Sequence, residues 1–294
     1  MHDGARVETF LHYRPLLLSI AYRMLGSMAD AEDLVQETFI RWQASSELDV
    51  HSPRAYLVTI VSRLCIQQLE SARVQREHYV GPWLPEPVST EATADPLAAS
   101  ELQDSLSMAF LLLLERLTPV ERAAFLLHDV FGYGYDDLVR VLSKSEASCR
   151  QIVHRARQHV TEHRPRFDAA PEQHERLVRA FVAAASSGNL AGLVSVLADE
   201  VVLYSDGGGK ANAAVRPVHG ALNVARFVLG AIAKSVPKDV SVHIEPVNGQ
   251  PGVVYRLPQG AAGCVISLVI TDQRISDILV VTNPDKLVHV ADRS

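Results

Sequence analysis

Residues 135–166 place a strongly basic helix inside an acidic chain, and this segment limits the possible folds more than any other. From Lys144 to Arg166 there are six lysines and arginines against two glutamates, whereas the whole chain has a formal net charge of -6. The apolar residues of the helix fall on one arc at 3.6-residue spacing. They are Cys149, Ile152, Val153, Ala156 and Val160. The helix therefore has to bury that arc against other helices and leave its basic face exposed.

A short helix and a tight turn precede the basic helix. Tyr135–Leu142 is apolar on one side, Ser143–Ser145 is polar, and Ser145 is suited to cap the next helix. This arrangement is typical of a helix-turn-helix, whose second helix enters the major groove of DNA. The residues expected to contact DNA are Ser148, Arg150, Gln151, His154, Arg155 and Arg157. The alternative is an ordinary surface helix with a solvated face; the capped turn and the local charge reversal favour DNA.

Three shifts in composition divide the chain, so we expect a multidomain protein. Residues 6–79 and 101–167 are predicted to form two all-α domains, the second containing the helix-turn-helix. Residues 80–100 between them are rich in proline and glycine and are predicted to form a linker. Residues 172–290 change to helices followed by alternating strand-like runs, which predicts a separate α+β domain.

Composition argues against several classes of protein and site. The three cysteines, Cys65, Cys149 and Cys264, are far apart and form no CxxC pair, so we expect neither a disulfide framework nor a cysteine zinc site. No apolar run is long enough to span a membrane, and the N-terminus lacks the apolar core of a signal peptide. We therefore expect a cytoplasmic protein with no bound metal or cofactor.

The predicted helix at Asp30–Trp42 carries acidic residues opposite its apolar stripe. This face, which we call the acidic ridge, consists of Asp30, Asp33, Gln36 and Glu37. Asp33 and Glu37 are like charges four residues apart, which costs an isolated helix a few tenths of a kcal/mol. Such a ridge either faces water or binds a cationic partner, and the residues alone favour water.

A long helix is predicted to start at Ser52–Pro53, with the serine as cap and the proline in the first turn. Its outer positions carry residues suited to nucleic acid, with arginines for phosphates and an aromatic ring for base stacking. They are Arg54, Tyr56, Arg63 and Arg73. The alternative is a core helix with one solvated side.

These segments, in this order, resemble the extracytoplasmic-function (ECF) sigma factors of bacteria. The resemblance rests on DAEDLVQETF at residues 30–39, PRAYL at residues 53–57 and the helix-turn-helix. It implies a promoter-specificity subunit without enzymatic activity, whose partners are promoter DNA and core RNA polymerase, through the β′ clamp helices and the β flap. The acidic ridge is then expected to dock on the β′ clamp helices.

The same resemblance assigns the two DNA-binding helices. The helix from Pro53 and the loop Gln43–His51 before it are expected to stabilise a melted, flipped base at −10. The helix Ser145–Val160 is expected to contact the −35 element. Gln67 stands where relatives often carry aspartate, so no −10 sequence preference is carried over.

Three short motifs resemble those of the ECF sigma factors with a fused SnoaL-like C-terminal domain, which has an NTF2-like cone fold. They are WLPEP (Trp83, Leu84, Pro85, Glu86, Pro87), DGGGK (Asp206, Gly207, Gly208, Gly209, Lys210) and NPDKL (Asn283, Pro284, Asp285, Lys286, Leu287). The resemblance implies that the three motifs gather between the linker and the C-terminal domain. It also implies that this domain modulates the sigma core from within the chain, without a separate anti-sigma protein. Taken alone, the residues of each motif favour a stiff linker or a plain turn, and only the resemblance favours a joint role.

Two other functions are compatible with parts of this sequence. SnoaL-like relatives include enzymes with an Asp/His acid–base pair, for which Tyr204, Asp206, His219 and His243 are the candidates here. A helix-turn-helix regulator fused to such an enzyme, or to a sensor of an unidentified small ligand, is therefore the main alternative. A simple dimeric repressor is the other, and it leaves the acidic ridge and the Pro53 helix without a role.

Overall fold

The chain forms two compact units, each with its own packed interior. The computed structural model describes residues 2–45, 52–76, 79–90, 106–163, 171–235, 237 and 239–290. The first unit comprises Met1–Glu77, Thr93–Leu106 and Phe110–His163, and the second comprises His78–Ala92, Ser107–Ala109 and Arg164–Ser294. The predicted fold class, helical domains followed by an α+β domain, is confirmed.

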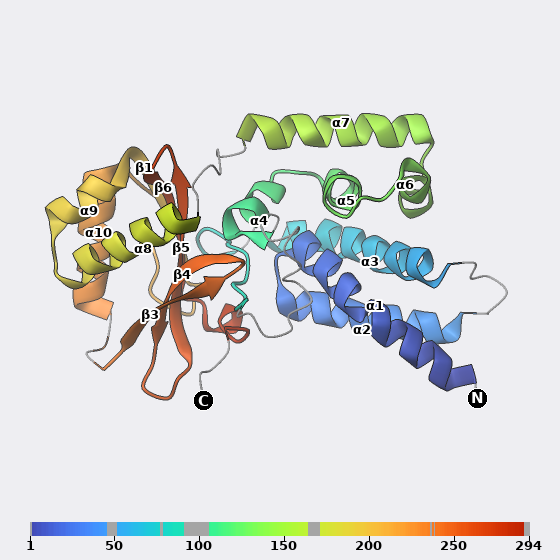
Figure 1. Ribbon diagram of the computed structural model, residues 1–294, viewed down its shortest axis with the longest axis horizontal. Helices are drawn as coiled ribbons and strands as arrows, with labels where there is room; N and C mark the ends of the chain where they lie inside the picture. The colour runs from blue at the N-terminus through green and yellow to red at the C-terminus, as the bar shows by residue number, and fades with distance from the viewer. Residues whose placement is uncertain are drawn as a thin grey trace. The chain divides into compact units, whose positions relative to one another are not determined.

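Three long helices, α1 (His2–Leu25), α2 (Met28–Ala44) and α3 (Pro53–Arg76), pack side by side in the first unit (Figure 1). Ser27 caps α2 by accepting a hydrogen bond from the backbone N–H of Asp30 at 3.2 Å. The predicted stripe of α2 faces inward. Its buried members are Ala31, Val35, Thr38 and Trp42.

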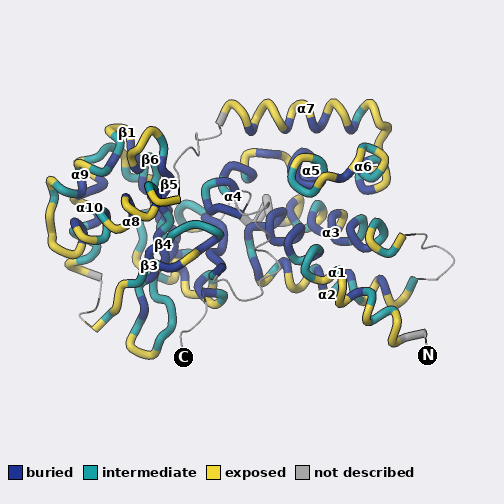
Figure 2. Tube along the Cα trace, viewed as in Figure 1, coloured by how far each residue is buried: buried dark blue, intermediate teal, exposed yellow. Residues whose placement is uncertain are grey.

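The helix-turn-helix is present as predicted. Helix α6 (Tyr135–Leu142) ends at Ser143, which adopts a left-handed conformation with φ 53°. Ser145 then caps α7 (Glu146–His163), because its Oγ accepts from the N–H of Ser148 at 3.3 Å. Helix α7 packs on α5 (Pro119–Phe125) and α6, and all five predicted apolar residues are buried while the opposite side is exposed (Figure 2).

Two further elements lie before and after α5. Helix α4 (Met108–Leu114), most of which belongs to the first unit, precedes a Thr118–Glu121 capping box that starts α5. A turn of π-helix, η5 (Leu126–Val130), follows α5 and was not predicted. Its wider turn carries Asp129, which contacts α7.

The second unit is built on a six-stranded sheet in the order β2-β1-β6-β5-β4-β3. The strands are β1 (Leu197–Asp206), β2 (Val218–His219), β3 (Ser241–Val247), β4 (Gln250–Arg256), β5 (Ala262–Thr271) and β6 (Arg274–Val281). Strands β1 and β6 are parallel, and the other neighbours are antiparallel. Strand β2 was missed from the sequence because two residues show no alternation.

Three helices cover one face of this sheet: α8 (Pro171–Ser186), α9 (Leu190–Val196) and α10 (Ala221–Ser235) (Figure 1). The main core lies between them and the strands, with Phe181, Leu203 and Ile278 among its buried residues. A short 3-10 turn, η6 (Pro284–Lys286), follows β6. The hairpin β3–β4 turns at Asn248–Gly249, both with positive φ, as a type I′ hairpin requires.

Candidate nucleic-acid interface and linker site

The exposed face of α7 carries all six residues predicted to contact the −35 element. Gln151, His154, Arg155 and Arg157 are exposed together with Arg150, and Ser148 is half-buried near the cap. A face with three arginines and no acid beyond Glu146 and Glu162 can hold phosphates and base edges.

The three arginines of this face differ in their protein contacts. Arg157 is held by Asp129 of η5 through both carboxylate oxygens, with Nε 3.0 Å from Oδ2. Arg150 pairs with Glu146 at 2.6 Å, and its guanidinium lies 4.2 Å from the centroid of the Tyr135 ring. Arg155 has a more distant acid, with its Nε 3.9 Å from Glu121 Oε1. Of the three arginines, Arg155 therefore has the guanidinium least engaged in contacts with the described part of the protein.

Two of the residues predicted to act at −10 contact the helix-turn-helix region within the same unit. The Nε of Arg54 donates to the hydroxyl of Tyr133 at 3.2 Å. The guanidinium of Arg63 donates to the carbonyls of Arg140 and Val141 at 2.5 and 2.9 Å, at the end of α6. In this arrangement both guanidiniums are bound to protein acceptors.

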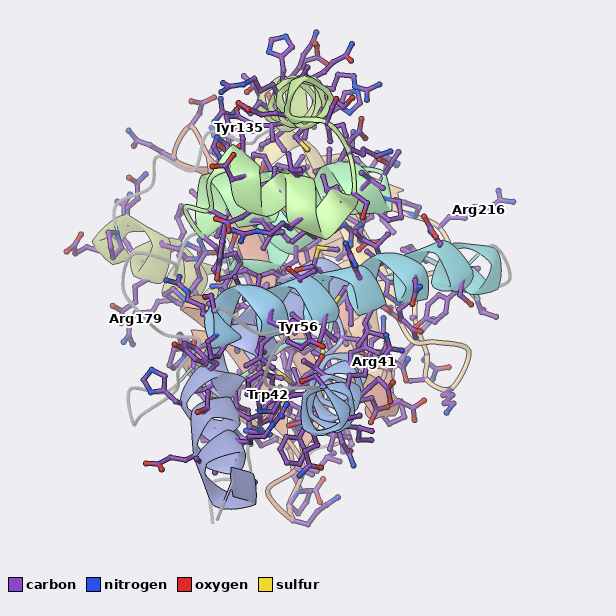
Figure 3. The ribbon with its side chains drawn as sticks, turned by 90° about the vertical axis from the view of Figure 1, so that its right-hand side faces the viewer. Arg41, Trp42, Tyr56, Tyr135, Arg179 and Arg216 are labelled. Atoms are coloured by element: carbon purple, nitrogen blue, oxygen red, sulfur yellow. The ribbon has the colours of Figure 1, made fainter. Side chains whose placement is uncertain are left out.

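The structure also describes Tyr56, another residue predicted to act at −10. Tyr56 of α3 is half-buried and lies against Trp42 of α2, with ring centroids 5.9 Å apart (Figure 3). The side chain of Arg73 and residues 46–51 of the predicted −10 loop lie outside the described residues.

The acidic ridge lies on the outer side of α2. Asp33 and Gln36 are exposed, and Asp30 and Glu37 are half-buried. Glu37 forms an exposed i,i+4 ion pair with Arg41 at 2.8 Å, which offsets its repulsion from Asp33. The ridge therefore presents carboxylates to solvent, as a surface for a cationic partner has to.

A buried polar cluster of the second unit surrounds Asp206 at the end of β1. Its carboxylate is fully buried and accepts hydrogen bonds from the Tyr79 hydroxyl (2.6 Å), the Leu84 N–H (2.8 Å) and the Gly208 N–H (3.1 Å). The ammonium of Lys286 completes the set at 2.8 Å. A buried carboxylate is stable only when it is paired and hydrogen-bonded in this way. Two of these donors, Tyr79 and Leu84, come from the linker.

Lys286 binds the linker a second time. Its Nζ donates to the carbonyl of Leu84 at 2.6 Å and lies 4.2 Å from the centroid of the Trp83 ring, a cation–π contact. Burial, followed by the hydrogen bond to Asp206, raises the pKa of Tyr79, so its hydroxyl stays protonated and donates. We call Asp206, Lys286 and the linker groups that they bind the linker clamp.

Further contacts continue along the linker. The buried Glu86 pairs with the ring Nδ1 of His289. The N–H of Val88 donates to the Asn248 side chain at 2.9 Å, and the Asn248 N–H donates back to the Val88 carbonyl at 2.9 Å. Thr90 also donates its N–H to the carbonyl of Pro246 at 3.0 Å. Residues 79–90 are thus fixed to the α+β domain along their length.

The three predicted motifs meet at this clamp, and each has a distinct place. WLPEP supplies Leu84 and Glu86 to the contacts just described, and residues 84–88 are buried. From DGGGK, Asp206 is buried, whereas Lys210 is exposed and pairs with the exposed Asp285 of NPDKL at 2.5 Å. The side chain of Asn283 donates to the Tyr79 hydroxyl at 3.1 Å.

Four residues that take part in the contacts between the linker and the α+β domain were not singled out from the sequence: Tyr79, Asn248, Thr90 and His289. Tyr79 was assigned to the end of the first helical domain, whereas α3 ends at Arg76 and Tyr79 belongs to the second unit. The only local signal was the Asn248–Gly249 turn, which fixes the backbone beside Val88.

The comparisons with known proteins agree with this arrangement. Residues 9–74 match the family model of Sigma-70 region 2, and residues 107–160 match that of Sigma-70, region 4. The chain is 38% identical over 289 residues to the ECF RNA polymerase sigma factor SigJ of Mycobacterium tuberculosis, covering 95% of this chain and 92% of the relative. It is 35% identical over 288 residues to the probable ECF sigma factor SigI of that organism, covering 97% and 96%. The chain belongs to the ECF RNA polymerase sigma factors.

A solved structure extends this likeness to the whole fold. The crystal structure of Mycobacterium tuberculosis SigJ matches with a TM-score of 0.77 and 36% identity, covering 96% of this chain and 98% of that one. As an ECF sigma factor with regions 2 and 4, the chain binds core RNA polymerase and recognises promoters, which confirms this part of the function predicted from the sequence.

The candidates for the enzymatic alternative have separate surroundings in this ECF sigma factor. Asp206 is bound by the linker, Tyr204 is half-buried, His219 is exposed and His243 pairs with Ser241 at 2.8 Å. Within the described part of the chain, no group of three or more His, Cys, Asp or Glu residues is placed to hold a metal ion.

A separate property concerns membranes. Across the helices that the structure describes, none has the length and apolar character needed to cross a bilayer.

The clamp requires glycine at position 208, which gives a direct test. Gly208 has φ +57°, and a Cβ there would lie 2.3 Å from Asn283 Nδ2. Gly208→Ala is expected to push Asn283 away from Tyr79 and to speed hydrogen exchange of residues 79–90, measured by mass spectrometry. Gly209→Ala is the matched control, because Gly209 also has a positive φ (+71°) but its Cβ would meet Val80 at 3.4 Å. Equal exchange in the two variants would contradict this account.

Proposed function

We propose that the α+β domain of this ECF sigma factor restrains the sigma core by holding the linker between regions 2 and 4. Polymerase binding then has to draw residues 79–90 out of the clamp before both DNA-binding helices can engage a promoter. The regulator is covalently attached, so this proposal needs no separate anti-sigma protein. The chain is proposed to work in the cytoplasm, where RNA polymerase meets promoter DNA.

The observation that carries this proposal is the fully buried carboxylate of Asp206. Two of its four donors belong to the linker, and its counter-ion Lys286 also binds a linker carbonyl. Pulling the linker away therefore removes two of the four donors from this carboxylate and exposes its ion pair with Lys286, so the linker is held by contacts that water has to replace.

The polymerase is proposed to bind through the acidic ridge on α2, with the β′ clamp helices as the cationic partner. The β flap is proposed to meet the region 4 module. The acidic ridge supports this mode of polymerase binding because the Asp33 side chain is exposed, so its carboxylate is accessible to water or to a cationic partner. The promoter is proposed to bind α7 at −35 and α3 at −10, the latter once Arg54 and Arg63 leave their protein acceptors.

We expect Asp33→Ala to weaken capture of core RNA polymerase by about tenfold, because it removes one exposed carboxylate from a charged interface. Binding is measured by pull-down and by titration with labelled protein at low and physiological salt. Glu172→Ala, which removes an exposed carboxylate from the first turn of α8, serves as control. An affinity for polymerase equal to that of wild type would refute the assignment of the ridge.

We expect Arg155→Ala to weaken binding to −35 DNA in the polymerase complex and to reduce the salt slope by about one unit, as the loss of one phosphate contact does. Arg179→Ala is the control, because Arg179 lies on α8 and pairs with Glu175. The measurement is fluorescence anisotropy of a −35 fragment over a range of salt concentrations. An unchanged slope and affinity would remove Arg155 from the interface.

Asp206→Asn tests the restraint itself. The substitution keeps the shape but removes the charge that holds Lys286, so we expect exchange of residues 79–90 to speed up by more than about tenfold. Promoter-dependent transcription with core polymerase is expected to rise, because the linker no longer has to be withdrawn from the clamp.

The control for this experiment is Asp285→Asn, which removes the exposed ion pair with Lys210 and is expected to change little. Unchanged exchange in Asp206→Asn would disprove the clamp. Faster exchange with equal or lower transcription would disprove the restraint while leaving the clamp intact.

A further inference from the structure

A cavity of about 830 Å³ lies between α10 and the strands of the α+β domain. Side chains of a strand alternate between the two faces of the sheet, so every second residue at the strand ends points toward it. From β1 these are Leu203 and Ser205, and from β5 they are Cys264 and Ile266. Its size falls within the range of roughly 300–1,000 Å³ found for small-molecule sites.

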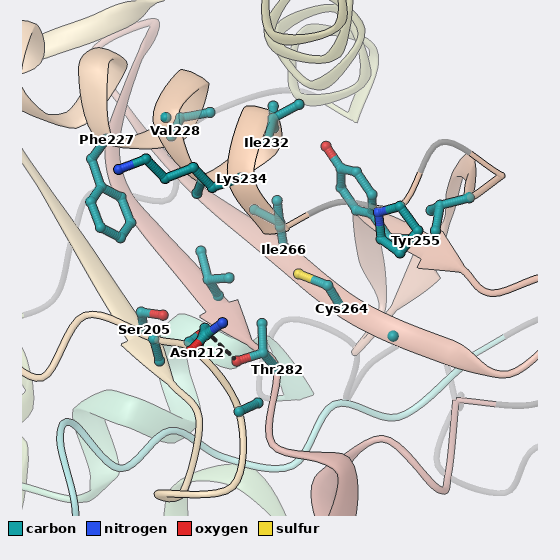
Figure 4. Close-up of a pocket in the computed structure, with 18 of the residues that line it drawn as sticks. Ser205, Asn212, Phe227, Val228, Ile232, Lys234, Tyr255, Cys264, Ile266 and Thr282 are labelled. Carbon is teal, nitrogen blue, oxygen red and sulfur yellow. Dashed lines mark hydrogen bonds between the residues drawn. The ribbon is translucent and has the colours of Figure 1, made fainter.

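The walls of the cavity are mostly apolar. Phe227, Val228 and Ile232 of α10 face Tyr255, Cys264 and Ile266 of the sheet (Figure 4). Burial raises the pKa of the Cys264 thiol to about 12, so it stays neutral and acts as part of the apolar wall.

Gly230 gives the clearest indication that space is kept here. It lies inside α10, lines the cavity, and a Cβ built on it would have no heavy atom within 4 Å. Glycine in a helix interior destabilises the helix relative to alanine, yet nothing in the packing requires it at this position.

The charged groups that line the cavity have one sign. Arg226 and Lys234 lie on α10 four residues to either side of Gly230, so all three lie along one stripe of the helix. Among the lining residues that the structure describes there is no aspartate or glutamate. Asp239, between the lining residues Pro237 and Val240, is exposed and does not line the cavity.

We propose that this cavity binds an amphipathic small-molecule anion. Its apolar body lies between α10 and the sheet, and its acidic group, such as a carboxylate, is held by Arg226 and Lys234. A few polar atoms elsewhere orient the body, among them the Tyr255 side chain and the group formed by Ser205, Asn212 and Thr282. No bond is made or broken, so the ligand is a bound effector.

The cavity and the linker clamp share their walls. Ser205 faces the cavity while its neighbour Asp206 is held by the linker, and the Thr282 N–H donates to the Asp206 carbonyl at 2.8 Å. Pro284 and Leu287 line the cavity on either side of Lys286 in sequence. A ligand that binds more tightly when the linker is held will strengthen the clamp, and the coupling is reciprocal. This coupling, unlike binding itself, rests on the restraint proposed above.

Binding is tested with the purified full-length chain and the fluorescent anion anilinonaphthalene sulfonate. We expect one saturable site from which decanoate displaces the probe at least about tenfold better than decanol does. Gly230→Phe fills the cavity and is expected to abolish this site, whereas the matched control Gly230→Ala adds one methyl group and retains it. Undiminished, displaceable binding in folded Gly230→Phe would overturn the proposal.

The charge requirement has its own pair of variants. Arg226→Gln with Lys234→Gln is expected to lower decanoate affinity at least about tenfold and leave decanol unaffected, while the exposed Arg216→Gln changes neither. If Gly230→Phe does not fold, hydrogen exchange of the wild-type chain decides: decanoate has to protect α10 and β5. Equal displacement by decanoate and decanol would leave an apolar site but disprove the anion.

The coupling between the cavity and the clamp is measured by hydrogen exchange of the linker. Saturating decanoate is expected to slow exchange of residues 79–90 in the wild-type chain, and Asp206→Asn is expected to bind decanoate more weakly. Binding without any effect on the linker would disprove the coupling and leave the ligand site standing. A linker that exchanges freely in the absence of decanoate would instead count against the proposed restraint.

Discussion

A single carboxylate, that of Asp206, determines how the linker and the α+β domain are joined. With no solvent exposure, it depends entirely on protein donors, and half of its side-chain donors come from a segment more than a hundred residues away in sequence. The backbone carbonyl of the same residue accepts from the N–H groups of Thr282 and Asn283 at 2.8 and 3.0 Å. Asp206 therefore holds together the end of β1, the linker and the turn after β6. If one of these segments moves, it breaks hydrogen bonds that it shares with the others.

Arginines of the helical unit are also bound by acceptors from distant segments of the chain. Arg63 binds carbonyls at the end of α6, and Arg157 binds Asp129 of the π-helical turn. These contacts satisfy guanidiniums that are suited to phosphates, since Arg binds carboxylates, carbonyls and phosphates with the same planar set of donors. Most of these arginines, although suited to DNA, are therefore bound to protein acceptors, and Arg155 is the least engaged of the α7 arginines.

Strand β1 connects the clamp with the cavity because consecutive residues point to opposite faces. Ser205 belongs to the apolar cavity beneath α10, and Asp206 to the polar site that holds the linker. The glycines that follow allow the chain to turn between the two. A Cβ on Gly207 would lie 2.4 Å from the carbonyl oxygen of Ala211, so the backbone passes too closely for any side chain there.

The sequence by itself determined the local features of this protein. The buried arc of α7, the capped turn at Ser145, the inward stripe of α2 and the change from helices to an α+β domain all follow from periodicity and capping, which act over a few residues. The family resemblance identified the three motifs but did not indicate which of their atoms are in contact. Only the tertiary structure decided that Tyr79 and Asp206, 127 residues apart, share a hydrogen bond, and that Glu86 pairs with His289. The cavity could not be predicted from the sequence. A void forms where side chains from two layers do not reach one another, and no local residue pattern indicates the distance between the layers.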